Sequence, residues 1–208
     1  MGTRKKVALE QFNRDNIITA AKELFETKGI EKTTMDDIAK LADYSKSTIY
    51  VYFKSKEDIY NKIVKEYLDM LTGELEVYIE GEEDFESSYY GVCDCLVRFE
   101  EKYPQYYASL MGEGKMTNSK KANTTTDIDM TGGLESLIRR LLEKGLRHKF
   151  IRTDLEIQPT VLYMWSAISG IIQVAERHRE GLDLRLNMNK EEYLRYSFKT
   201  FYESLVRR

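Results

Sequence analysis

Cysteine and proline are scarce in this sequence of 208 residues, which contains 2 of each. So few prolines leave long stretches free to form unbroken helices. Cys93 and Cys95 lie two positions apart, so on a helix they point to different faces, which disfavours a disulfide between them. No export signal is recognisable at the N-terminus, so we expect two reduced thiols in the cytoplasm.

Long apolar runs are absent as well. The longest nearly apolar stretch, VLYMWSAISGIIQVA from Val161 to Ala175, is fifteen residues long and contains serine and glycine. Such a run is too short to cross a bilayer and favours a buried helix, so we expect no membrane association. The only two histidines, His148 and His178, lack the spacing of metal ligands, and the Cys-x-Cys pair has no histidine nearby. The sequence therefore predicts no metal site.

The composition favours an all-α protein, with 42% hydrophobic and 32% charged residues. The net charge of −3 is unevenly distributed, because residues 1–56 carry 11 Lys and Arg against 8 Asp and Glu. The N-terminal part is therefore basic and the remainder acidic. A basic segment of this kind is compatible with binding to a polyanion.

Helical patterns fill the first sixty residues. Residues 13–28 carry apolar side chains at helical spacing and end at Gly29. Thr34 with an acidic residue three positions later predicts a helix start. Asp43 is suited to a left-handed turn, and Ser45 is suited to cap a second short helix. Ser55 with Asp58 opens a longer helix.

Two short helices joined by a tight turn and packed on a third predict a helix-turn-helix, whose second helix enters the major groove of DNA. Ile49 and Phe53 face inward, which leaves a polar outer face over SKSTIYVYF. Hydroxyl groups and lysines there can contact bases and phosphates. The alternative is that Tyr50 and Tyr52 are packing residues between helices.

The stretch TTMDDIAKLADYSKSTIYVYFKSKEDIY resembles the DNA-binding signature of the TetR family of transcriptional regulators. The resemblance covers roughly residues 12–60. It implies a homodimer, an all-helical C-terminal ligand domain, and a set of residues on the DNA face: Thr34, Ser45, Lys46, Ser47, Thr48, Tyr50, Tyr52 and Lys56. Asp43, Tyr44 and Ser47 depart from the family pattern, which more often has glycine, a small aliphatic residue and glycine there.

The rest of the chain also reads as helices. Stripes of apolar residues predict helices over 85–111, 134–147, 160–179 and 190–207, with Pro104 ending or bending the first of them. Residues 112–133 are poor in apolar side chains and predict a long connection, with room for a short helix. We accordingly divide the chain into a DNA-binding domain, residues 10–56, and a ligand-binding and dimerisation domain, residues 57–208.

The helix predicted over 160–179 is apolar on almost every side and therefore needs cover all round. Pairing this helix and the helix over 190–207 with their copies would form a four-helix dimer interface, as the family resemblance also implies. The alternative is that one subunit covers the helix completely.

Aromatic side chains are frequent in the same domain. They predict a pocket for a hydrophobic or aromatic effector, although such stripes are also typical of plain core. The candidates for the pocket are Tyr89, Phe99, Tyr103, Tyr107, Tyr163 and Trp165.

Motifs of catalysis are missing. The G-x-G-K in MGEGKMT lacks the spacing of a phosphate-binding loop, and no serine or cysteine sits in a nucleophile motif. We therefore expect no enzyme and no cofactor, but a cytoplasmic repressor that binds a palindromic DNA operator as a homodimer and is released by a small-molecule effector. The alternatives are a DNA-binding protein without a ligand and an interaction module that has lost DNA binding.

Overall fold

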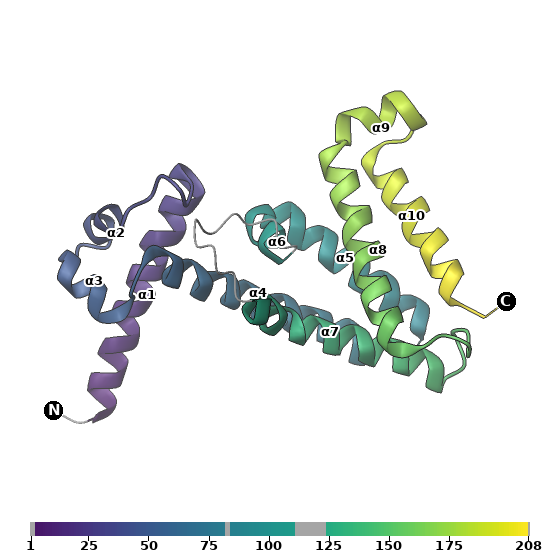
Figure 1. Ribbon diagram of the computed structural model, residues 1–208, viewed down its shortest axis with the longest axis horizontal. Coiled ribbons are helices and arrows are strands. Elements are labelled where there is room, and N and C mark those ends of the chain that lie inside the picture. Colours follow the sequence, from purple (N-terminus) through teal and green to yellow (C-terminus); the bar gives the residue numbers. More distant parts are fainter. Residues whose placement is uncertain (1–2, 82–83, 111–123, 208) are drawn as a thin grey trace. The chain divides into compact units, whose positions relative to one another are not determined.

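The computed structural model describes residues 3–81, 84–110 and 124–207, and these residues are almost entirely helical (Figure 1). The predicted all-α fold is confirmed. The helices are α1 (Thr3–Lys28), α2 (Met35–Leu41), α3 (Lys46–Tyr52), α4 (Lys56–Gly81), α5 (Phe85–Lys102), α6 (Pro104–Leu110), α7 (Thr124–Arg147), α8 (Ile157–Arg177), α9 (Arg179–Leu186) and α10 (Lys190–Leu205). Within the described ranges, none of these helices is long and apolar enough to cross a membrane.

The chain forms two compact units, Met1–Tyr67 and Leu68–Arg208. The division falls inside α4, whereas the limits predicted from the sequence place the boundary at the start of that helix. The reason is that the first three turns of α4 contribute Ile59 and Ile63 to the core of the first unit. The start of α4 is still set locally, because Ser55 Oγ accepts a hydrogen bond of 3.2 Å from the amide of Asp58.

The core of the first unit is built from one face of each of its helices. The predicted inward positions Ile49 and Phe53 are buried. Of the apolar stripes predicted in the first two helices, Ile17, Ala21, Phe25 and Ile38 are buried, Leu24 and Ala42 are half-buried, and Leu41 is exposed. The buried apolar residues of the first unit are Ile17, Ile18, Ala20, Ala21, Phe25, Ile38, Ala39, Ile49, Phe53, Ile59, Tyr60, Ile63 and Val64.

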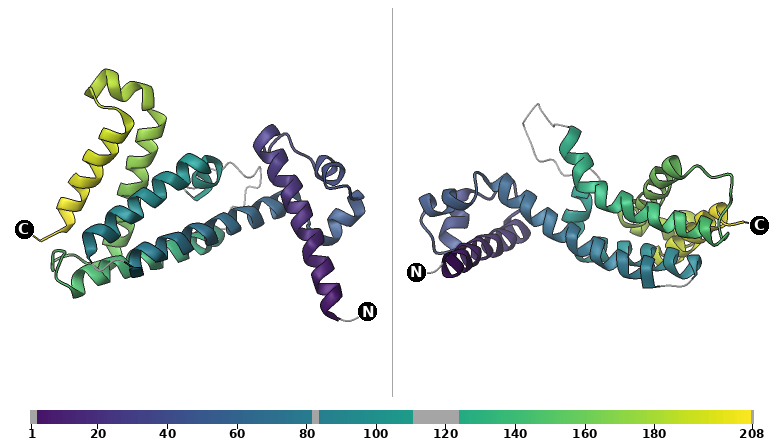
Figure 2. Two further views of the ribbon diagram at one scale, coloured as in Figure 1. Left: turned by 180° about the vertical axis from the view of Figure 1, so that it is seen from behind. Right: turned by 90° about the horizontal axis from the view of Figure 1, so that it is seen from below.

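The second unit is organised around α5, which packs against α6, α7, α8 and α10. Helices α8 and α10 also pack on each other, and α9 connects them (Figures 1 and 2). Tyr89 lies at the centre, fully buried, with its hydroxyl donating a 2.9 Å hydrogen bond to the carbonyl of Phe198. Cys93 and Cys95 are buried on α5 as free thiols. Burial raises the pKa of both thiols, that of Cys95 to about 12.

Several element limits differ from the prediction. Helix α1 begins at Thr3 rather than at residue 13, because residues 3–12 contain good helix formers and no glycine or proline. The side chains of residues 4–12 are exposed and form no apolar stripe. Helix α7 begins at Thr124, so the last part of the predicted connection 112–133 is helical, while 112–123 lies outside the described residues. Pro104 divides α5 from α6 as predicted. Helix α9 was not expected, since it is short and mostly polar.

Candidate nucleic-acid interface and cavities

The turn between α2 and α3 has the geometry of a helix-turn-helix. Asp43 adopts the left-handed conformation at φ 58°, which its short polar side chain tolerates, and Tyr44 donates its amide to the carbonyl of Ala39 at 2.9 Å. Ser45 then caps α3, because its hydroxyl accepts a 3.1 Å hydrogen bond from the amide of Thr48. The left-handed turn and the serine cap, both predicted from the sequence, are confirmed.

Helix α3 is anchored to α1 through Asn13. The side-chain nitrogen Nδ2 of Asn13 donates to the hydroxyl of Tyr52 at 2.8 Å, and the side-chain oxygen Oδ1 accepts from the hydroxyl of Tyr44 at 2.8 Å. Arg14 donates to the backbone carbonyl of Tyr52 at 3.1 Å and lies over the rings of Tyr52 and Phe53. These contacts fix the position of α3 on α1. The hydroxyl of Tyr52 thus makes a hydrogen bond within the unit, and this contact agrees with the alternative that Tyr52 packs between helices.

The opposite face of α3 is exposed and polar. Lys46 and Ser47 are exposed, Thr48 is half-buried, and the side chain of Tyr50 is 49% exposed. The hydroxyl of Ser45 lies 2.8 Å from the hydroxyls of both Ser47 and Thr48. Hydroxyl groups in this arrangement can donate to or accept from base edges and phosphates.

The ammonium of Lys46 is paired with an acidic neighbour. It donates to Asp36 of α2 at 2.9 Å, and both side chains are more than half exposed. The hydrogen bond to Asp36 and its charge raise the pKa of Lys46. An exposed pair of this kind is weak and exchanges readily for a phosphate or a base edge. The sequence alone does not single out Asp36, because the pairing depends on how α2 and α3 meet.

Thr34 caps α2 in a complete capping box with Asp37. The hydroxyl of Thr34 accepts from the amide of Asp37 at 3.1 Å, and Asp37 accepts from the amide of Thr34 at 2.9 Å and from Lys28 at 2.6 Å. The hydrogen bond from Lys28, followed by those from Thr34, lowers the pKa of Asp37 to about 2. Thr34 is itself exposed at the same end of the helix. The predicted cap is confirmed.

Lys56, like Tyr52, has its polar group bound within the unit. Its ammonium donates to the backbone carbonyls of Ile30 at 2.8 Å and of Glu31 at 3.2 Å. It thereby stabilises the loop between α1 and α2, so in this structure the charge is used within the unit.

The six aromatic residues predicted as a ligand pocket do not line one common cavity among the described residues. Tyr89 and Phe99 are buried in the core, and Tyr89 contacts several other rings. Phe99 contacts Tyr103, which is half-buried. Tyr163 is 57% exposed on α8. Trp165 lines a small cavity of about 70 Å³ between α7 and α8.

Tyr107 lines a cavity of about 290 Å³ between α5, α6 and α8. Its side chain is only 2% exposed, yet its hydroxyl has no hydrogen-bond partner among the described residues. Of the six predicted residues, Tyr107 therefore combines a cavity with an unused polar group.

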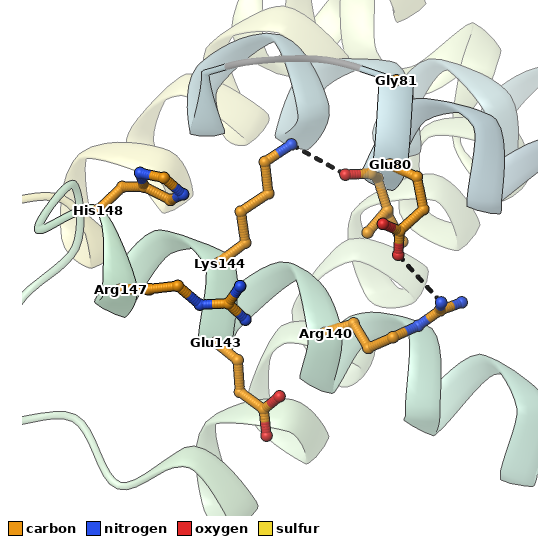
Figure 3. Close-up of a pocket in the computed structure, with 8 residues that line it drawn as sticks. Glu80, Gly81, Arg140, Glu143, Lys144, Arg147 and His148 are labelled. Carbon is orange, nitrogen blue, oxygen red and sulfur yellow. Dashed lines mark hydrogen bonds and ion pairs between the residues drawn. The ribbon is translucent and has the colours of Figure 1, made fainter.

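A larger polar cavity of about 640 Å³ lies between the ends of α4 and α7 (Figure 3). Arg140 pairs with Glu80 at 2.9 Å and with Glu76 at 2.6 Å, while Lys144 donates to the carbonyl of Ile79 at 2.9 Å. Arg140 and Lys144 thus bind the acidic side chains and the end of α4. Across the parts of the chain that the structure describes, no group of three or more His, Cys, Asp or Glu side chains is placed to hold a metal ion.

The fold and the turn define the first unit as a helix-turn-helix module. Residues 17–63 match the model of the bacterial regulatory proteins of the tetR family, and this match lies wholly within the first unit. The first unit is thus similar to the bacterial regulatory proteins of the tetR family.

Two relatives in sequence are also described as helix-turn-helix regulators. The biofilm operon icaADBC HTH-type negative transcriptional regulator IcaR of Staphylococcus epidermidis is 29% identical over 122 residues, covering 57% of this chain and 64% of that protein. IcaR of Staphylococcus aureus strain Newman is 33% identical over 98 residues, covering 47% and 53%. The matches thus span between about half and two thirds of the length of these curated relatives. They are regulators rather than enzymes, in agreement with the sequence prediction.

Solved structures share the fold over nearly the whole chain. The fatty acid degradation regulator FadR from Bacillus halodurans superposes with a TM-score of 0.69 at 16% identity, covering 94% of this chain and 97% of that one. FadR from Bacillus subtilis in complex with stearoyl-CoA gives a TM-score of 0.71 at 18% identity, covering 91% and 97%.

Proposed function

We propose that the protein is a DNA-binding transcriptional regulator, and specifically a repressor, that holds a palindromic operator as a homodimer and responds to a small-molecule effector. The observation that carries the DNA-binding part is the exposed polar face of α3, held on α1 by Asn13 and Tyr52. Repression is supported by the similarity to IcaR, which is a negative transcriptional regulator. A regulator acts where the DNA is, so we also propose that the protein is cytoplasmic, as predicted from the sequence.

On the proposed operator, Lys46, Ser47 and Thr48 contact base edges, since they start α3 and face outward. Thr34, Ser45 and Tyr50 hold phosphates. Tyr52 and Lys56 support the interface mainly from within the unit, because their polar groups are already bound to Asn13 and to the loop before α2.

The dimer is proposed to form through α8 and α10. These helices pack on each other and still expose large apolar side chains, which are Leu162, Tyr163 and Val174 on α8 and Tyr196 on α10. A single subunit therefore does not cover α8, contrary to the alternative that it does. An exposed apolar surface on two adjacent helices suits a self-complementary interface.

Selection of binding sites from random DNA duplexes, followed by salt titration, tests the function. Enrichment of a symmetric motif, bound with strong salt dependence, is the expected result. Recovery of no enriched motif, together with affinity that Lys46→Ala and Thr48→Ala leave unchanged, would refute it.

A further inference from the structure

The cavity beside Tyr107 is lined by three helices of the second unit. Its volume is about 290 Å³, near the lower limit for pockets that hold small molecules. The residues that line it are Glu100 from α5, Pro104, Tyr107 and Ala108 from α6, and Gln173, Glu176 and Arg177 from α8. Two carboxyl groups and one guanidinium thus face the space, together with apolar surface from proline and alanine.

Two polar atoms at this cavity lack partners. One is Oε2 of Glu100, which is buried and accepts no hydrogen bond from any described residue, and the other is the hydroxyl of Tyr107. Buried polar atoms are almost always hydrogen-bonded in folded proteins, so an unpaired acceptor and an unpaired hydroxyl on two residues that line the same cavity indicate a missing donor.

The neighbouring carboxylates have their own cations. Glu176 is bound by Arg179 at 2.9 Å and by Lys190, and Lys190 also donates to Glu101 at 2.7 Å. Among the residues that the structure describes, Glu100 has no such ion pair. Burial, followed by the negative charge of Glu176, raises its pKa to about 7. Desolvation also raises the pKa of Tyr107, and the charge of Glu100 adds to this effect.

We propose that this cavity binds a small organic cation, whose ammonium group donates to Glu100 Oε2 and to the hydroxyl of Tyr107 while its apolar body lies against Pro104 and Ala108. An ammonium carries three donors and no acceptor, which matches an unpaired carboxylate oxygen and a phenol. A carboxylate or phosphate ligand could pair with Arg177, which also lines the cavity, but it carries only acceptors and would leave Glu100 Oε2 without a donor. Binding of the cation does not require DNA, whereas the role of the cation as the effector rests on the proposed function.

Calorimetric titration of the full chain with three probes of one size tests the charge preference. The probes are benzylammonium, benzyl alcohol and benzoate. Benzylammonium is expected to bind at least about tenfold more tightly than the other two, because only it supplies a charged donor. Binding should release about half a proton at pH 7, since a carboxyl with a pKa of about 7 must ionise fully to hold the cation. Titration in two buffers of different ionisation enthalpy measures this release.

Variants locate the binding. Glu100→Gln is expected to weaken benzylammonium at least about tenfold and to abolish the proton release, and Tyr107→Phe to weaken it a few-fold. Asp94→Asn is the matched control, because Asp94 is exposed on the same helix and does not line the cavity. It should keep both affinity and proton release.

The unaltered protein gives a further test that does not depend on the folding of a variant. Its affinity for benzylammonium should rise between pH 6 and pH 8 as Glu100 ionises. Equal binding of benzyl alcohol, full affinity in Glu100→Gln, or no binding of benzylammonium at about 10 mM would each overturn the inference. None of these measurements uses DNA, so failure here is distinguishable from failure of the proposed operator binding.

Discussion

The hydroxyl of Tyr52 accepts a 2.8 Å hydrogen bond from the side-chain nitrogen Nδ2 of Asn13, and this bond joins the last residue of α3 to α1. Tyr50, two residues earlier, is 49% exposed. Removing each hydroxyl should therefore have different effects. Tyr52→Phe is expected to lower the free energy of unfolding by about 1 kcal/mol, the usual net value of one hydrogen bond. Tyr50→Phe should leave it unchanged and weaken DNA binding. Urea unfolding and DNA titration of both variants measure this, and equal stability losses would contradict it.

The ion pair between Lys46 and Asp36 predicts a gain of function. Asp36→Asn removes a negative charge from the proposed DNA face and frees the ammonium of Lys46, so DNA affinity should rise a few-fold at low salt. The gain should shrink as salt is added. Glu143→Gln makes the same charge change in the second unit and should have no such effect. Affinity that falls in Asp36→Asn would show that the carboxylate helps to position Lys46.

Lys56 is expected to matter for stability as well as for DNA. Lys56→Ala removes two hydrogen bonds to the carbonyls of the loop before α2, so the free energy of unfolding should fall by about 1 kcal/mol. Lys54→Ala is the comparison, because Lys54 is exposed and its side chain makes no hydrogen bond to the rest of the described chain. Chemical denaturation of the two variants separates the roles. A Lys56 variant as stable as the parent, but weak on DNA, would assign Lys56 to phosphate contact alone.

Leu162 offers a clean test of the proposed dimer. Its side chain is 58% exposed on α8, so Leu162→Asp should convert a dimer into folded monomers. Phe201 on α10 is less suitable, because it is buried and contacts Tyr163 and Tyr89, so a charge there would disrupt the subunit itself. Sedimentation with circular dichroism distinguishes the two results. A monomeric parent protein at micromolar concentration would rule the interface out.

Glu100 predicts a specific pH dependence of stability. Its pKa in the folded chain is about 7, above the ordinary value of 4.5, so folding favours the protonated form. The free energy of unfolding should therefore fall as pH rises from about 4.5 to about 7. Glu100→Gln should remove this fall and be more stable than the parent at pH 8, on the order of 1 kcal/mol because the carboxyl is partly solvent-exposed. Urea midpoints of both proteins from pH 5 to pH 8 measure the difference.

The sequence predicts the first unit in more detail than the second. Thr34, Asp43 and Ser45 act through hydrogen bonds and backbone angles within a few residues, so their roles are visible locally. Asn13 and Asp36 are not predictable in this way, because their partners depend on how helices meet. The same reason explains the cavity at Glu100, whose lining comes from three helices. An aromatic stripe also cannot distinguish Tyr89, which is core, from Tyr107, which faces a cavity.

Both cysteines lie on α5, and the first unit contains none. Their burial and raised pKa make the thiolate rare and inaccessible in the folded chain, so a thiol reagent can react only when α5 opens. The rate at which a thiol reagent labels the native protein thus measures the rate of opening of the second unit alone. Any ligand that stabilises this unit should lower the labelling rate. Such binding can therefore be measured through the native cysteines, with no added fluorophore or engineered residue.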